Sequence, residues 1–243
     1  MQWREISIIL SIKSFSENAR IVTLFNKSLG KISAIFKNTK SSLQMGDVCD
    51  IFWKGRSSED LGKIKIEEII FSPFCRVFQD SAKIFAVDSA CSMCANGLLT
   101  AAPHEQLFIY LMNFLLSIQK ENWVANYVFF EMSLLAEVGY GLDLSKCAVT
   151  GAKEGLAYVS PKTGCAVTKE VGWMYKDKLF PLPEFLISEK VIPNKYDIFC
   201  ALNITGHFLK AYFYGINESD LPLSRSYLTE IIASCHEDVH KAM

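Results

Sequence analysis

Residues 130–164 contain two kinds of sequence pattern, one after the other: FEMSLLAEVGYGLDLSKCAVTGAKEGLAYVSPKTG. Its first part has apolar residues at helical spacing, among them Phe130, Leu134 and Val138, and predicts an amphipathic helix that ends at Gly139. Its second part alternates turn and strand patterns in the segments CAVTG, YVSP and TGCAV. The stretch therefore predicts a long helix followed by a small hairpin insertion at about residues 145–175.

The hairpin has the layout of two zinc-knuckle halves, but each half carries a single thiol. These thiols are Cys147 and Cys165, and the two knuckles continue with Thr150 and Thr168. A structural zinc site needs four ligands, and a neutral hydroxyl is a poor replacement for a thiolate. We therefore expect a hairpin held by its own packing, with no metal and no other cofactor.

Toward the N-terminus, residues 1–76 have the pattern of a small β domain. Alternating and β-branched residues predict five strands, at about 6–12, 20–25, 31–37, 48–54 and 63–70. Phe52 and Trp53 are neighbours in the fourth strand and are expected to point to opposite faces. Five short strands without a long helix between the early ones favour a closed Greek-key barrel, and an oligonucleotide-binding (OB) fold is the natural candidate.

Toward the C-terminus, residues 77–243 are expected to form a mainly helical domain that carries the hairpin. Helices are predicted at about 81–100, 105–120, 122–138, 196–214 and 222–242. Cys91 and Cys94 form an isolated CxxC in an apolar, Ala-rich setting, so we expect them to pack inside a helix. The predicted fold class is α+β multidomain, with a five-stranded OB-fold barrel at 1–76 and a helical domain with a zinc-finger-like hairpin at 77–243.

Composition limits the class of protein in the same way. A chain of 243 residues that is 50% apolar can bury a sizeable core. Its longest uncharged runs, 89–104 and 106–119, are shorter than the roughly 20 residues of a membrane span. The first residues lack the apolar core of a signal peptide, so we expect a cytoplasmic protein with reduced cysteines.

The formal charge of −1 conceals an asymmetry between the two halves. Residues 1–76 hold 12 Lys or Arg against 8 Asp or Glu, whereas residues 77–243 hold 13 against 18. The small β domain therefore has a charge of +4 and the helical domain a charge of −5. A basic barrel is a suitable partner for nucleic acid.

The sequence contains no recognisable catalytic constellation. Phosphate-cradling Gly-rich loops, GxSxG and HExxH are absent from it. His236 and His240 share one helix face but have no third ligand in sequence, and they are interpreted as exposed polar side chains without a catalytic role. His207 lies in the apolar segment TGHFL and is interpreted as a structural hydrogen-bonding residue. We therefore do not expect an enzyme.

The chain resembles the RecO family of recombination mediators over nearly its whole length, and in particular the alphaproteobacterial type that has lost zinc ligands. The central block is the most specific part. The residues that carry the resemblance are Trp3-Arg4, Glu17, Gly30-Lys31, Leu43-Gln44, Gly46, Phe130-Glu131, Leu134-Leu135, Gly139-Tyr140, Leu142-Asp143-Leu144, Cys147, Tyr158-Val159-Ser160-Pro161 and Thr205-Gly206-His207-Phe208-Leu209.

The resemblance implies a non-enzymatic mediator of DNA repair and homologous recombination. Such a protein binds single-stranded DNA, promotes strand annealing, and helps to load RecA together with RecR on gaps coated with single-strand binding protein, whose C-terminal tail it contacts. It would be cytoplasmic and associated with the nucleoid. In the family, a Lys-Gly-x-Arg turn follows the third strand, and here the residues are Lys37, Asn38, Thr39 and Lys40. The expected DNA-binding residues are Lys37, Lys40, Arg20, Lys31, Lys54 and Arg56.

Two alternatives remain open at the level of sequence. One is a protein-interaction adaptor, in which the barrel is structural and the acidic helical domain binds partners. The other is a metal-dependent enzyme that uses the hairpin, which metal analysis of the purified chain would test. DNA binding distinguishes the mediator from the adaptor, because phosphate contacts make affinity strongly dependent on salt.

Overall fold

A computed structural model describes residues 1–37, 42–57, 61–188, 190–214 and 220–241, and the side chains of all of these up to residue 234. The chain divides into two compact units, Met1–Trp123 and Val124–Met243. Each unit is built around its own core, and the two are described separately below.

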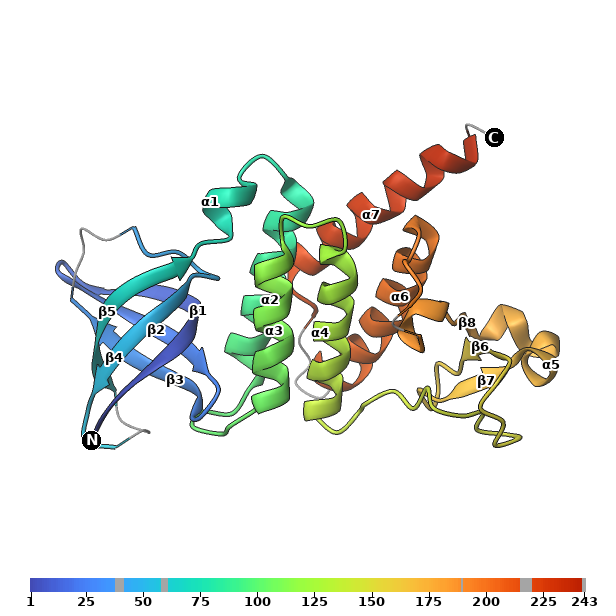
Figure 1. The fold of residues 1–243 in the computed structure, drawn as a ribbon, viewed down its shortest axis with the longest axis horizontal. Helices are drawn as coiled ribbons and strands as arrows, with labels where there is room; N and C mark the ends of the chain where they lie inside the picture. The colour runs from blue at the N-terminus through green and yellow to red at the C-terminus, as the bar shows by residue number, and fades with distance from the viewer. Residues whose placement is uncertain (38–41, 58–60, 189, 215–219, 242–243) are drawn as a thin grey trace. The chain divides into compact units, whose positions relative to one another are not determined.

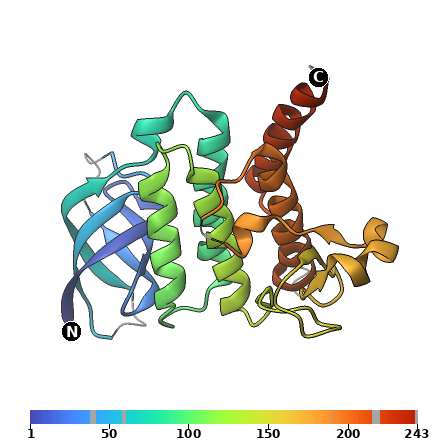
Figure 2. The same ribbon diagram turned by 45° about the vertical axis from the view of Figure 1, so that its right-hand side comes forward.

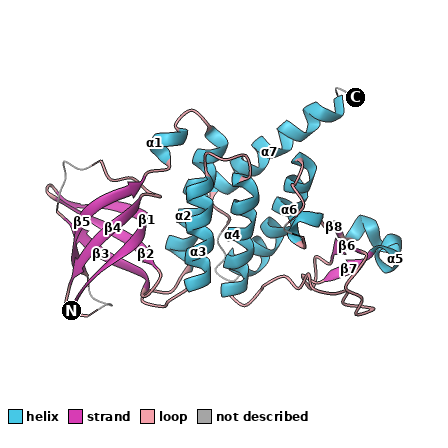
Figure 3. Ribbon diagram, viewed as in Figure 1, coloured by secondary structure: helices cyan, strands magenta, loops and turns pink. Residues whose placement is uncertain are grey.

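The first unit begins with the five predicted strands. These are β1 (Gln2–Ser16), β2 (Ala19–Asn26), β3 (Gly30–Phe36), β4 (Val48–Lys54) and β5 (Gly62–Phe71). They pair in the order β1-β2-β3-β5-β4, and β4 also pairs with β1, so the sheet closes on itself (Figure 3). Every pair is antiparallel except β3 with β5. The predicted strands are confirmed, and β1 extends further at both ends.

The interior of this sheet is organised around a tryptophan. The Trp53 side chain is completely buried and stacks on Trp3, with ring centroids 5.6 Å apart. Gly62 lies directly against the indole, since a Cβ at this position would come within 2.3 Å of the ring. Phe52, its neighbour in β4, is only half-buried, as expected for a strand whose successive side chains alternate between faces.

Three helices complete the first unit: α1 (Phe74–Val77), α2 (Ser81–Gly97) and α3 (Glu105–Ser117) (Figure 1). They pack at the end of the sheet where β2 turns into β3, and there Phe25 meets Phe108 edge-on at 5.6 Å. Cys91 and Cys94 are fully buried in α2, which confirms that they are packing residues. Burial raises the pKa of the Cys94 thiol well above its ordinary value.

The second unit contains the remaining helices and the hairpin. Its helices are α4 (Trp123–Glu137), whose residues from Val124 belong to this unit, α6 (Lys195–Phe208), the π-helical segment η3 (Leu209–Tyr214) and α7 (Leu223–Lys241). The hairpin is a small sheet with strand order β7-β6-β8, namely β6 (Leu156–Val159), β7 (Ala166–Thr168) and β8 (Phe180–Pro181). Short helical segments adjoin it: α5 (Lys169–Gly172), η1 (Trp173–Lys178) and η2 (Glu184–Leu186).

These elements confirm the predicted helices and the hairpin. The single helix expected at 196–214 is divided into α6 and η3. Within the described part of the chain, each helix falls short of the length or the apolar character that crossing a bilayer requires.

A buried ion pair connects the three long helices of the second unit. Arg225 of α7 is 2% exposed and Glu131 of α4 is 0% exposed. The guanidinium donates two hydrogen bonds to this carboxylate, through Nε to Oε1 and through Nη2 to Oε2, the latter at 2.9 Å. Nη2 also donates to the carbonyl of Leu202, and the Thr205 hydroxyl of α6 donates to the carboxylate.

We predict that removal of one member of this pair is costly and that removal of both is not. Glu131→Leu leaves the Arg225 charge buried without its counter-ion, which destabilises by about 3–5 kcal/mol in comparable cases. The double variant Glu131→Leu/Arg225→Met removes both charges and should lie much closer to the wild type. Urea unfolding followed by circular dichroism measures both free energies. Equal losses for the single and the double variant would contradict the prediction.

Candidate nucleic-acid interface

The closed sheet brings several lysines together on its outer surface. Lys54 of β4 lies directly opposite Lys63 of β5, and Lys63 lies opposite Ile35 of β3. Lys37 follows β3 two residues after Ile35 and lines one groove with Lys65. We call Lys37, Lys54, Lys63 and Lys65 the basic cluster.

Alternation along the strands explains why these lysines face outward. Trp53 and Ile64 point into the core, so their neighbours Lys54, Lys63 and Lys65 point to solvent. Side chains directly opposite each other in neighbouring strands have Cβ atoms about 5 Å apart, and like charges in this position repel. In the described residues, neither Lys54 nor Lys63 forms an ion pair with a carboxylate. Phosphate groups would relieve this repulsion.

A shallow groove of about 610 Å³ adjoins the cluster where β5 diverges from β3. The parallel pairing of the two strands ends at Phe36 and Ile64, and the groove continues along β5 as far as Ile69. Lys37 stands at its beginning, whereas Glu67 and Glu68 line its other part. Lys65 is partly neutralised by Glu67, with Nζ and Oε2 2.8 Å apart. The positive charge is therefore concentrated at Lys37, Lys54 and Lys63.

The residues predicted from sequence occupy different parts of the sheet. Arg20 lies opposite Phe36 at the same sheet end as Lys37, and Arg56 is exposed two residues beyond Lys54. Lys31 lies at the opposite end, where its ammonium donates to the carbonyl of Ala95 at 2.8 Å and burial lowers its pKa. Lys40 falls outside the described residues.

Sequence reasoning missed Lys63 and Lys65. Their signal was the alternation KIKIE at residues 63–67, which places both lysines on one face of the predicted fifth strand. Phe52 lies opposite Lys65 in the β4–β5 register and on the outer face. It offers a ring beside the lysines, while Trp53 is committed to the core.

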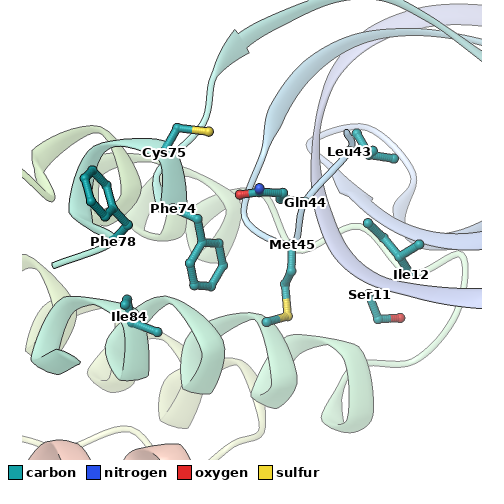
Figure 4. A pocket seen from close by; sticks show the side chains of 9 residues that line it. All are labelled: Ser11, Ile12, Leu43, Gln44, Met45, Phe74, Cys75, Phe78 and Ile84. Atoms are coloured by element: carbon teal, nitrogen blue, oxygen red, sulfur yellow. The ribbon is translucent and has the colours of Figure 1, made fainter. Parts of the chain in front are cut away.

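A second, apolar groove of about 830 Å³ lies in the same unit, lined by β1, the segment before β4, α1 and α2 (Figure 4). Figure 4 shows the Gln44 amide pointing toward the α1 side of this groove. Its Oε1 atom is buried and has no hydrogen-bond partner among the described residues. The remaining lining residues are Ser11, Ile12, Leu43, Met45, Phe74, Cys75, Phe78 and Ile84.

The hairpin of the second unit holds a buried thiol in place of a complete knuckle. Cys147 Sγ accepts a hydrogen bond from the backbone N–H of Thr168 at 3.4 Å, and it lies 3.7 Å from the hydroxyl oxygen of Thr168. Burial raises the pKa of this thiol, but hydrogen bonds from the Thr150 hydroxyl and from backbone N–H groups outweigh burial and lower the pKa to about 6. Over the described residues, no group of three or more His, Cys, Asp or Glu is arranged to hold a metal ion.

The structure also explains two of the segments that resemble the RecO family. His207 Nε2 lies 3.0 Å from the carbonyl oxygen of Pro161, and so it connects TGHFL with the hairpin segment YVSP. The His207 ring packs edge-on against Phe180 at 5.2 Å. These contacts support the interpretation of His207 as a structural residue. Thr205 of the same segment belongs to the buried Glu131–Arg225 group.

Comparison with known proteins defines the class of this chain as a recombination protein. The family model "Recombination protein O N terminal" matches residues 1–73, and "Recombination protein O C terminal" matches residues 79–217. The chain belongs to the RecO family.

Its relatives are similar over most of their length. It is 37% identical over 224 residues to "DNA repair protein RecO" of Wolbachia pipientis wMel, covering 88% of this chain and 93% of that protein. It is 36% identical to the RecO protein of Rickettsia bellii (strain OSU 85-389), over 88% of this chain and 90% of that one. It is 35% identical to that of Caulobacter vibrioides (strain NA1000 / CB15N), over 96% and 98% of the two chains. The resemblance expected from sequence is confirmed.

We predict that Cys147 makes the stability of the protein dependent on pH. Because folding lowers the pKa of its thiol, the stabilisation is complete above the unfolded pKa of about 8.5 and is lost as the pH falls through a folded value of about 6. The free energy of unfolding should therefore rise between pH 6 and pH 9 more steeply in the wild type than in Cys147→Ser, whose hydroxyl does not ionise. Urea midpoints at three pH values measure this difference, and parallel pH profiles would refute it.

Proposed function

We propose that this protein acts in DNA repair and homologous recombination as a mediator that binds single-stranded DNA through its N-terminal sheet. The observation that carries the proposal is the opposed pair Lys54 and Lys63, beside Lys37, on the outer face. Two lysines that repel one another, and that have no carboxylate partner among the described residues, suit a polyanion, and a half-buried ring at Phe52 lies next to them. The names of the relatives, "DNA repair protein RecO", support the same role.

The fold supports this proposal, because five strands that close on themselves are what a small Greek-key barrel of the OB type would need, and we propose that the sheet is of this type. We assign the nucleic-acid-binding domain to residues 1–76 and the helical domain to residues 77–243, with the hairpin at about 145–175. Of the residues expected from sequence, Lys37, Lys54, Arg20 and Arg56 belong to the proposed site together with Lys63 and Lys65. Lys31 has a structural role at the helix-facing end of the sheet.

The mechanism depends on binding energy alone. Lysines that neutralise phosphates reduce the repulsion between two complementary strands and so promote annealing. Acting with RecR on gaps coated with single-strand binding protein, the protein would exchange that protein for RecA. Association with the nucleoid would follow from the same DNA contacts.

The apolar groove supports a partner site in addition to the DNA site. It offers the rings of Phe74 and Phe78 to apolar side chains of a bound peptide, and Gln44 is a polar residue in its lining. We propose that it takes the apolar end of the acidic C-terminal tail of single-strand binding protein. If this groove binds a partner and the sheet binds no DNA, the protein is a protein-interaction adaptor and the role of its sheet is structural.

We predict that Lys54→Ala/Lys63→Ala weakens binding to a labelled oligo-dT and reduces its dependence on salt. For each phosphate that the variant no longer neutralises, the slope of log affinity against log salt should become shallower by about 0.7. Fluorescence anisotropy measures both quantities across a salt series of about 50 to 300 mM NaCl, in which interactions between exposed charges become screened. The matched control is Lys27→Ala, an exposed lysine at the opposite sheet end that pairs with Glu105. If the control and the double variant behave alike, the basic cluster is not the DNA site.

We predict that Phe78→Ser abolishes most of the affinity for a labelled tail peptide and leaves oligo-dT binding unchanged. Phe78 is 69% exposed at the rim of the groove, so its replacement should not disturb the core. Loss of one apolar anchor costs about 1–3 kcal/mol, or roughly a tenfold loss in affinity. Anisotropy of the labelled peptide measures the change, with Leu99→Ser, an equally exposed apolar residue, as the control. Unchanged peptide affinity in Phe78→Ser would place the tail elsewhere.

A further inference from the structure

The hairpin of the second unit has a charge opposite to that of its surroundings. Residues 145–178 contain six lysines and three acidic residues, a formal charge of +3. The rest of Val124–Met243 contains five basic and eleven acidic residues, a charge of −6. All six lysines are exposed. The acidic half of the chain therefore contains a distinct basic patch.

Exposed aromatic residues lie within this basic patch. Trp173 is 56% exposed, Met174 86% and Tyr175 59%, and they follow one another in η1. The neighbouring Gly172 is buried against the hairpin, where a Cβ would come within 2.4 Å of the Tyr158 ring. This close approach holds one side of the α5–η1 segment on β6. Figure 2 shows the segment projecting from the second unit beyond α6, and residues 173–178 are exposed.

The 3₁₀ geometry of η1 places one lysine with each ring. Residues three apart in such a helix eclipse one another, so Lys176 lies over Trp173 and Lys178 shares a side with Tyr175. The first pair is in contact, since Lys176 Nζ is 4.6 Å from the centre of the Trp173 ring. The two pairs lie on adjacent sides of η1, and we call these four residues the aromatic–lysine face.

We propose that the aromatic–lysine face of η1 is a second contact site for single-stranded nucleic acid, at which bases stack on Trp173 and Tyr175 and phosphates lie on the lysines. Stacking rings interleaved with cations are the pattern by which proteins bind single strands without regard to sequence. The cores of protein interfaces are depleted in lysine, so a protein partner is less well matched. The segment is also much shorter than the amphipathic helices that lie on membranes.

This site deepens the proposed function and rests on it. A mediator that anneals strands must hold nucleic acid at more than one point, and a second weak site on the same chain raises the overall affinity through effective concentration. The lysines of the hairpin supply this second point in a half of the chain whose net charge disfavours nucleic acid.

Tryptophan fluorescence of the full chain tests the proposal directly. Of the four tryptophans, Trp53 is buried, Trp3 is partly buried and stacks on it, Trp123 is 8% exposed and Trp173 is 56% exposed. Addition of oligo-dT should therefore quench the fluorescence of the wild type by stacking on Trp173. The matched variant Trp173→Phe keeps a stacking ring but removes the signal, so it should bind with similar affinity and without this quenching.

Affinity provides the second measurement. Trp173→Ala/Tyr175→Ala should weaken oligo-dT binding at least about fivefold, since each base–ring stack typically contributes that much or more. Tyr110→Ala, which removes an exposed ring from α3, should bind like the wild type. Lys54→Ala/Lys63→Ala should retain the Trp173 quenching at high protein concentration, because the second site is intact in that variant.

The outcomes separate this inference from the proposed function. If the wild type binds oligo-dT by anisotropy while its fluorescence is unquenched and Trp173→Ala/Tyr175→Ala binds equally well, the second site does not exist and the proposed function stands. If the wild type does not bind oligo-dT at low salt, both are wrong. If vesicles of phosphatidylglycerol shift the Trp173 emission to the blue and oligo-dT does not change it, the face binds membranes, and the inference is overturned.

Discussion

The burial of Trp53 inside the closed sheet decides where the charges of the first unit lie. The indole fills the interior between Trp3 and Gly62, and no side chain at position 62 would fit beside it. Since the side chains of a strand alternate, an inward Trp53 requires an outward Lys54, and the register with β5 then places Lys63 beside it. A slip of one residue would bring the lysines into the core. The proposed DNA site is thus a consequence of the same packing that closes the sheet.

The packing of the second unit depends on buried polar side chains that form hydrogen bonds with one another. Its long helices share the bidentate Glu131–Arg225 pair, and Thr205 supplies a further hydrogen bond to the carboxylate. In the hairpin, the Cys147 thiol accepts hydrogen bonds from backbone N–H groups. Cys147 begins the first CAVT repeat and Thr168 ends the second, and their contact connects the two halves of the hairpin. Hydrogen bonds and packing therefore maintain the shape of a knuckle in a hairpin with half of its thiols.

Much of this fold was predictable because its signals are local. The strands of the closed sheet follow from alternation over short windows, and the long helices from apolar spacing, so these elements were found within a few residues of their bounds, whereas the short α1, α5, η1, η2 and β8 were not predicted. The family resemblance located Glu131 and Thr205 without a physical reason. Arg225 was missed, because a pair separated by 94 positions in sequence leaves no periodic trace. The division of the helix at 196–214 into α6 and η3 was also beyond a spacing argument, which does not distinguish α-helical from π-helical turns.

The candidate site was only partly predictable, for a related reason. Charge counts pointed to the half of the chain in which we propose the site, but they treat Lys31 and Lys54 alike, although one ammonium is bound to a helix carbonyl and the other faces a second lysine. Only the strand register distinguishes the environment of Lys31 from that of Lys54. The same averaging concealed the hairpin patch, since a charge of −5 for residues 77–243 is the sum of a basic insertion and a strongly acidic remainder. Where a surface charge lies relative to the nearest opposite charge and the nearest exposed ring, rather than the total for a domain, determines what the surface can bind.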